Sequence, residues 1–449
     1  PKLRVVVGAF ASPTKNLSVR LCFIFKQLIP YTHRVWANLM KSHGIDSPTT
    51  WVIENFMPIR GLVQKLNTSA RSQRKSVFLQ TLDFSTLYTM LAHGPLKERM
   101  NEAFDILFNH RSFDFPQPVP PAPAYTHIRY SLSAKNRLFQ FCMGPDAEEE
   151  VQPRRGKRRR KAPTPIKWMY VSKADLKEWF SFLIDNVWLR LGFILARQTI
   201  GIPMGTNCAV FIANFFLWMC EFDWIRRHLS RGNQSVVRKF QYTKRYIDDI
   251  LSADNPDFMK YAVFDSIHFD DGSPAGIYPR FLTLNLEQSG VAVSFLHLFI
   301  YFSKRTRNIE ITLYSKSRDP KFAKVPFNKY THILSKIQLK CKINVVISET
   351  LRYARICTEK HSFVTHVAHL ICKLLDKGHK LSRLYTTLRC VAIHLTLTLH
   401  LYGYSSPHFL VNDVKERART MRKHAFRWKL HLRPFARYIK PPFPRALAH

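Results

Sequence analysis

The stretch "KRYIDDILSADN", from Lys244 to Asn255, places two aspartates side by side between apolar residues in a basic chain. Adjacent carboxylates repel, and Ile247 and Ile250 indicate that the pair lies near a core rather than out in solvent. Burying such a pair costs on the order of several kcal/mol unless it is neutralised or coordinates a cation. A metal site is therefore one interpretation of Asp248 and Asp249, and a solvated turn is the other.

The charge balance is the strongest signal in the composition. The 449 residues include 69 Lys and Arg against 31 Asp and Glu, a formal net charge of +38. Such an excess favours a polyanionic partner, most commonly nucleic acid, although non-specific stickiness is an alternative. We expect no membrane partner, because the sequence shows no basic amphipathic helix, lipid anchor or sufficiently long apolar run. Eight cysteines without a C-x-x-C pair indicate neither a zinc site nor a disulfide framework.

Apolar periodicity predicts alternating strands and helices through the centre of the chain. The expected helices are residues 95–110, 172–192 with a Ser172 cap, and 208–229, which is apolar on nearly every side. The expected strands are residues 280–290, 291–302 and 308–316, together with residues 76–89, which read as a strand followed by a turn, and residues 237–255, which read as a strand, tight turn and strand. Since Asp83 and the aspartate pair both fall at strand ends, we predict an α+β fold with a mainly antiparallel sheet.

Residues 111–165 differ in composition from the segments on either side. They contain the proline-rich "FPQPVPPAPAY" (115–125) and the basic "PRRGKRRRKAPTP" (153–165). This composition predicts a partly disordered loop insertion between two core segments. The basic run has three open interpretations: a nuclear-import signal, a nucleic-acid arm or a solvated charge run. It leads us to expect a nuclear location, and an organelle fits the charge equally well.

Three boxes in order carry a resemblance to reverse transcriptases. "YIDDI" (246–250) resembles their Tyr-x-Asp-Asp box, "LDFSTLYTML" (82–91) their first catalytic-aspartate segment, and "QTIGIPMGTNCAVFIANFFL" (198–217) their second conserved block. The sequence of these three boxes is similar to that of the Penelope-like family of retrotransposons, whose polymerases are related to telomerase catalytic subunits. The resemblance covers about residues 1–385 outside the insertion, without a GIY-YIG endonuclease.

This resemblance implies a right-hand polymerase with fingers, palm and thumb, in which helices back an antiparallel palm sheet. The implied parts are shortened fingers (1–75), a first palm segment (76–110), the insertion (111–165), the main palm (166–320) and a thumb-like helical region with a basic tail (321–449).

The resemblance also implies residue roles. Asp83, Asp248 and Asp249 would be the catalytic carboxylates and the ligands of two Mg²⁺ ions, with Mn²⁺ as an alternative. Tyr88, five residues after Asp83, would be a steric gate against a ribose 2′-hydroxyl, a packed tyrosine being the alternative. The other implied nucleotide-binding residues are Lys2 and Arg4 at the triphosphate, the Phe84 backbone carbonyl, and Gln198, Gly201, Pro203, Met204 and Gly205 in a turn beside the incoming base and template.

The activity implied is that of an RNA-directed DNA polymerase, which adds deoxynucleotides to a primer 3′ end. Its partners would be an RNA template, a DNA primer and the RNA–DNA duplex they form. The alternative is a catalytically inactive relative that kept the fold as an RNA-binding protein, with a structured RNA in a ribonucleoprotein or ribosome as its partner. A viral-type RNA-dependent RNA polymerase is a third hypothesis, and Tyr88 argues against it.

Overall fold

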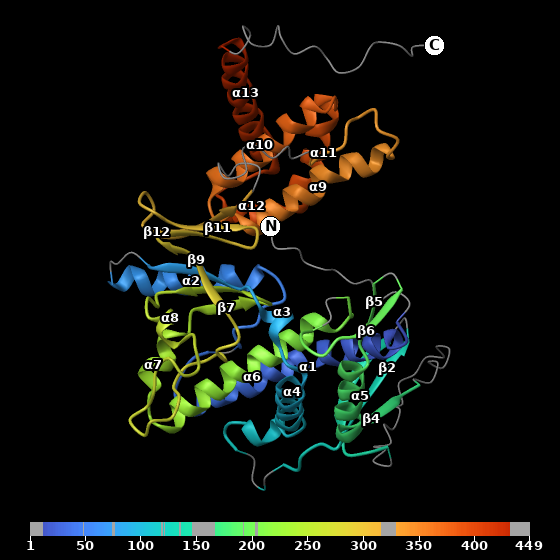
Figure 1. Ribbon diagram of the computed structural model, residues 1–449. Helices are drawn as coiled ribbons and strands as arrows, with labels where there is room; N and C mark the ends of the chain where they lie inside the picture. Colours follow the sequence, from blue (N-terminus) through green and yellow to red (C-terminus); the bar gives the residue numbers. More distant parts are fainter. Residues whose placement is uncertain are drawn as a thin grey trace, which may run out of the picture. The chain divides into compact units, whose positions relative to one another are not determined.

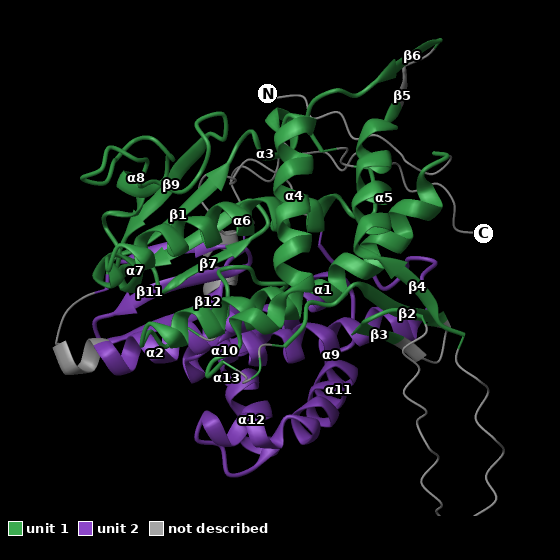
Figure 2. Cartoon of the chain, turned by 90° about the horizontal axis from the view of Figure 1, so that it is seen from below, with its two compact units in different colours: residues 1–55, 78–290 green, residues 56–77, 291–449 purple. Residues whose placement is uncertain are grey.

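The computed structural model describes residues 12–47, 49–73, 77–117, 120, 122–133, 136–145, 167–191, 193–202, 205–315 and 329–431 (Figure 1). The chain forms two compact units, unit 1 from residues 1–55 and 78–290, and unit 2 from residues 56–77 and 291–449 (Figure 2). This division differs from the expected subdomains, since residues 56–75 were expected in the fingers and 291–320 in the palm.

Unit 1 is built around a four-stranded antiparallel sheet with strand order β7-β8-β1-β9. Its strands are β1 (Leu79–Phe84), β7 (Thr243–Tyr246), β8 (Asp249–Ala253) and β9 (Leu284–Gly290). The predicted antiparallel sheet is confirmed, as is the hairpin that carries the aspartate pair. The hairpin begins later than expected, because residues 234–239 form a short helix, α7 (Gln234–Lys239), rather than a strand.

The core of unit 1 lies around helix α6 (Ala209–Ser230), which is buried on nearly every side as its composition predicted. Helices α1 (Lys15–Ser42), α4 (His93–Phe108) and α5 (Lys173–Asp185) contribute to the same core. Helix α5 begins at the predicted cap: the Asp175 amide donates to Ser172 Oγ at 3.0 Å, and the Ser172 amide donates to Asp175 Oδ2 at 3.1 Å. The remaining helices of unit 1 are α3 (Leu87–Met90), η1 (His110–Phe113) and α8 (Phe258–Tyr261).

The loop predicted for residues 111–165 is wrong in its described part. Strands β2 (His127–Ser133) and β3 (Asn136–Cys142) form a hairpin, and β4 (Met169–Ser172) completes a three-stranded sheet. Ile128 and Tyr130 alternate with polar residues along β2 and are fully buried, which is the period-two pattern of a half-buried strand. The neighbouring prolines and basic residues hid this pattern. Residues 146–166 lie outside the described part of the chain. A separate hairpin, β5 (Trp188–Leu191) and β6 (Ile194–Arg197), precedes the glycine turn.

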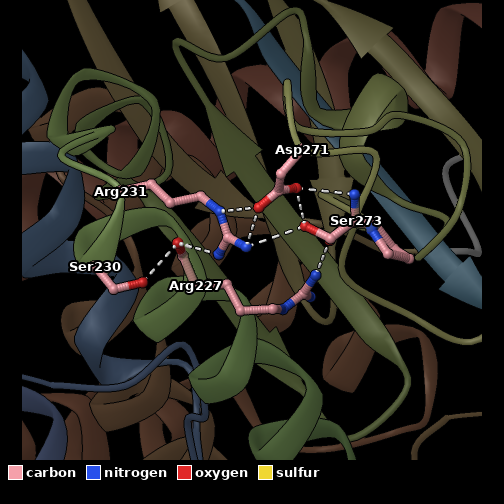
Figure 3. Close-up of polar contacts among 6 residues, drawn as sticks. Arg227, Ser230, Arg231, Asp271 and Ser273 are labelled. Atoms are coloured by element: carbon pink, nitrogen blue, oxygen red, sulfur yellow. Dashed lines mark hydrogen bonds and ion pairs between the residues drawn. The ribbon is translucent and has the colours of Figure 1, made fainter.

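Arginines at the end of α6 form hydrogen bonds with the loop that spans residues 263–280 (Figure 3). Arg227 Nη2 donates to the Gly276 carbonyl at 2.8 Å. Arg231 Nη2 donates to Asp271 Oδ2 at 2.7 Å and to Ser273 Oγ at 3.1 Å. Cations at a helix C-terminus also interact favourably with the helix dipole. These contacts attach the loop to one end of α6.

Unit 2 combines a three-stranded antiparallel sheet with helices. Its strands are β10 (Ala292–Phe295), β11 (Leu298–Ser303) and β12 (Asn308–Leu313), and its helices are α2 (Met57–Gln73), α9 (Leu339–Ile356), α10 (Lys360–Asp376), α11 (Leu381–His394), α12 (Thr396–Leu401) and α13 (Pro407–His431). Asn67 explains why α2 belongs here: its side chain donates to the Ile309 carbonyl at 3.0 Å and accepts from the Ile309 amide at 2.7 Å. Within the described ranges, no helix is long and apolar enough to cross a membrane.

Candidate active site

Three carboxylates from two distant segments meet at one end of the unit 1 sheet. In the register of β1 and β8, Asp83 lies directly opposite Asp249. Asp248 occupies the two-residue loop between β7 and β8, and its carbonyl accepts a hydrogen bond from the Phe84 amide at 3.2 Å. One carboxylate oxygen from each of Asp83, Asp248 and Asp249 lies within 4.8 Å of the others, and all three residues are half-buried. Antiparallel pairing therefore brings together residues that are 165 positions or more apart, from 83 to 248.

This arrangement fits a divalent cation. Mg²⁺ and Mn²⁺ take hard oxygen ligands, and Mg²⁺ is commonly held by one or two carboxylates together with substrate phosphates. Without a counter-charge, three carboxylates this close would repel one another. In the part of the chain that the structure describes, no other group of three or more His, Cys, Asp or Glu side chains is arranged to hold a metal ion.

Tyr88 lies beside the carboxylates on the short helix α3. Burial raises the pKa of the Tyr88 phenol well above its ordinary value, and the Asp248 carboxylate raises this pKa further. The phenol therefore stays neutral at physiological pH and presents a ring rather than a charge. The Phe84 side chain is buried and meets the Tyr278 ring edge-on, with 4.9 Å between the ring centroids.

The glycine turn packs directly against the segment that carries Tyr88. Gly201 donates from its amide to the Leu91 carbonyl at 2.7 Å, and the Ile202 amide donates to the Tyr88 carbonyl at 2.8 Å. The His93 Nε2 atom is hydrogen-bonded to the Gly201 carbonyl at 3.0 Å. Gly201 has φ +87°, and a Cβ atom on it would lie 2.5 Å from the Tyr88 carbonyl oxygen. Only glycine fits this position.

The other predicted nucleotide-binding residues are placed only in part. Gln198 Nε2 donates to the Ile200 carbonyl at 2.9 Å, so this side chain supports the turn. Gly205 precedes α6 at the end of the same turn. Four predicted residues lie outside the described residues: Lys2, Arg4, Pro203 and Met204.

A buried polar network under the aspartate hairpin was not predicted. Arg245 Nε lies 2.6 Å from Glu221 Oε1, and both side chains are fully buried. Tyr278 Oη donates to Glu221 Oε1 at 3.0 Å, and Asn214 Oδ1 accepts from Arg245 Nη1 at 2.9 Å. Burial raises the pKa of Glu221, and Arg245 opposes this rise. The sequence did contain a signal, because a carboxylate inside an apolar helix such as α6 requires a buried partner.

Comparison with known proteins adds a fold relationship. No protein-family model and no curated protein matches this sequence. Among solved structures, telomerase from Candida albicans, in complex with the TWJ fragment of telomeric RNA, matches with a TM-score of 0.53 and 12% identity, covering 88% of this chain and 56% of that chain. Apo telomerase from Candida tropicalis also matches, with a TM-score of 0.35 and 12% identity, covering 87% of this chain and 54% of that chain. The chain thus spans little more than half of these telomerases, and over that span its mixed helical and antiparallel-sheet fold is similar to that of the Candida albicans telomerase.

Proposed function

We propose that this protein is an RNA-directed DNA polymerase. The observation that carries the proposal is the convergence of Asp83, Asp248 and Asp249 at one end of an antiparallel sheet, in a fold similar to that of a telomerase. A protein that kept the fold only to bind RNA has no need for three neighbouring carboxylates, which would repel the phosphates of its ligand. The intact cluster therefore favours the enzyme over the inactive RNA-binding alternative.

In the proposed reaction, the primer 3′-hydroxyl oxygen bonds to the α-phosphorus of a deoxynucleoside triphosphate, the bond from the α-phosphorus to the bridging oxygen breaks to release pyrophosphate, and the hydroxyl proton passes to solvent. Two bound divalent cations would neutralise the attacking and leaving oxygens of such an in-line transfer. Asp83, Asp248 and Asp249 would hold these cations, and the Phe84 carbonyl would contribute a ligand to one of them. The Tyr88 ring would exclude a 2′-hydroxyl, and the glycine turn at Gly201 would lie beside the base pair.

The proposed partners are an RNA template and a DNA primer. The net charge of +38 suits the RNA–DNA duplex, and the Candida albicans neighbour was solved with RNA. The sequence of the three boxes favours an origin in a Penelope-like retrotransposon. The basic run at 153–165 favours a nuclear location.

Primer extension by the purified chain tests this function. We expect incorporation of deoxynucleotides on an RNA template in Mg²⁺ or Mn²⁺, with the Asp248→Asn variant, purified identically, as the control for contaminating polymerases. Salt-sensitive RNA binding that is equal in both proteins, with no incorporation by either, would instead establish the RNA-binding alternative.

Sugar selection gives a second test at the same site. Replacing Tyr88 with valine removes the ring beside Asp248 while keeping an apolar side chain. We expect incorporation of ribonucleotides relative to deoxynucleotides to rise about 10- to 100-fold, the range that shape discrimination in a pocket usually supplies. The measurement is the ratio of kcat/KM for the two substrates. An unchanged ratio with an active variant would mean that Tyr88 is a packing residue.

A further inference from the structure

The guanidinium of Arg245 has an acceptor for each of its five N–H groups. Nε and Nη2 donate to the two Glu221 carboxylate oxygens at 2.6 and 3.3 Å. Nη1 donates to Asn214 Oδ1 at 2.9 Å, and Nη2 also donates to the Asn214 carbonyl at 3.3 Å. The remaining Nη1 hydrogen bond, at 2.9 Å, goes to the Ile247 carbonyl. A planar fork of five donors is a property of arginine that lysine cannot reproduce.

The bond to Ile247 reaches the loop that presents the aspartate pair. Ile247 has φ +58°, a backbone conformation that is rare for a β-branched residue and persists only where the surroundings hold it. The Ile247 carbonyl accepts the hydrogen bond from Arg245 Nη1, and the next residue in the chain is Asp248. The Arg245 backbone is itself held, since its amide donates to the Trp51 carbonyl at 2.6 Å and its carbonyl accepts from the Ile53 amide at 2.9 Å. Arg245 therefore joins the hairpin loop to the rigid interior of unit 1.

The same network reaches the strand that carries Asp83. Tyr278 donates to Glu221 and packs edge-on against Phe84, the residue after Asp83. One carboxylate on α6 thus supports both segments whose aspartates converge.

Stability alone does not explain this network. A buried ion pair is weak evidence for stabilisation, because desolvation of the two charges offsets much of their attraction, and an apolar replacement of similar volume is often neutral. What an apolar replacement cannot supply is the bond that fixes the Ile247 carbonyl.

From this geometry we propose that Arg245, held by Glu221 and Asn214, is a positioning residue that sets the spacing of the metal-binding carboxylates. The inference rests on the proposed function, but its first readout does not require activity. Groups that orient metal ligands typically change metal affinity or activity by about 10- to 100-fold when they are replaced.

The test measures Mn²⁺ binding to the full chain by electron paramagnetic resonance, followed by the Mg²⁺ concentration for half-maximal primer extension. For Arg245→Lys we expect the Kd for Mn²⁺ and the half-maximal Mg²⁺ concentration each to rise by about 10- to 100-fold. The KM for the deoxynucleotide should change little. The double variant Arg245→Met/Glu221→Leu removes the charges together and should fold, yet show the same weakened Mn²⁺ binding. Tyr278→Phe keeps the ring against Phe84 but removes the hydrogen bond to Glu221. It should therefore raise the Kd for Mn²⁺ by less than Arg245→Lys does.

Arg231→Lys is the matched control. Arg231 also donates several hydrogen bonds at the end of α6, but its partners are Asp271, Ser273 and the Arg227 carbonyl rather than the aspartate hairpin (Figure 3). It should leave Mn²⁺ binding and extension unchanged. The proposal is overturned if Arg245→Lys, or the folded double variant, binds Mn²⁺ as the wild type does. Arg245-dependent Mn²⁺ binding in a wild type that incorporates no nucleotide would support the positioning role and contradict the polymerase function.

Discussion

Asp248→Asn is expected to lower the rate of nucleotide incorporation by about a thousandfold or more while making the metal-free protein more stable. The loss follows because several kcal/mol of charge stabilisation in the transition state depend on the carboxylate cluster, and each ~1.4 kcal/mol changes the rate tenfold. The gain in stability follows because the cluster brings three like charges within 4.8 Å. At about 4 Å, each repulsive pair costs between roughly 1 and 4 kcal/mol, depending on exposure to water. Asparagine is also tolerated in tight turns, so the loop should keep its shape.

The measurements are single-nucleotide extension and the thermal unfolding temperature with and without Mg²⁺. Mg²⁺ at a hundred times its Kd stabilises a binding-competent protein by about 2.7 kcal/mol, so the wild type should gain stability from the ion and the variant should gain less. Asp254→Asn is the matched control, because it removes one exposed carboxylate just beyond the other end of β8. If this control lost as much activity as Asp248→Asn, the effect would come from net charge and the cluster would have no special role.

Gly201→Ala is expected to reduce both stability and activity sharply. The new Cβ would lie 2.5 Å from the Tyr88 carbonyl oxygen and 3.3 Å from the Thr89 Cα, both backbone atoms that a rotamer change cannot move. The positive φ of Gly201 adds roughly 1–2 kcal/mol of strain for any other residue. We expect a loss of about 3 kcal/mol in the free energy of unfolding, measured by urea denaturation. Because the clash displaces the Tyr88 backbone, discrimination against ribonucleotides should weaken in whatever activity remains.

Gly232→Ala separates the two causes. Gly232 has φ +74° in the same unit, but a Cβ atom added to it would meet no atom within 4 Å, so this variant carries the backbone strain without the clash. It should lose only about 1–2 kcal/mol and keep its activity. Equal losses from the two variants would show that the contact between the glycine turn and Tyr88 contributes nothing.

Much of the fold was readable in the sequence because local patterns carry it. The apolar run of α6, the Ser172 cap and the alternation around the aspartate hairpin each specify an element through contacts between residues close in the chain. Other local patterns were misleading. The prolines and arginines of 111–165 dominated the composition and concealed the β2–β3 hairpin, in which Ile128 and Tyr130 of β2 are buried.

The residues alone determined which side chains could do the chemistry, namely a distant aspartate and an adjacent pair, with a tyrosine and a glycine turn at defined intervals. Only the tertiary structure decided that these lie together, since the register of β1 against β8 sets Asp83 opposite Asp249. It also decided what lies beneath them. Arg245 and Glu221 meet because α6 packs under the sheet, and such a pairing depends on long-range packing that no local pattern of residues encodes.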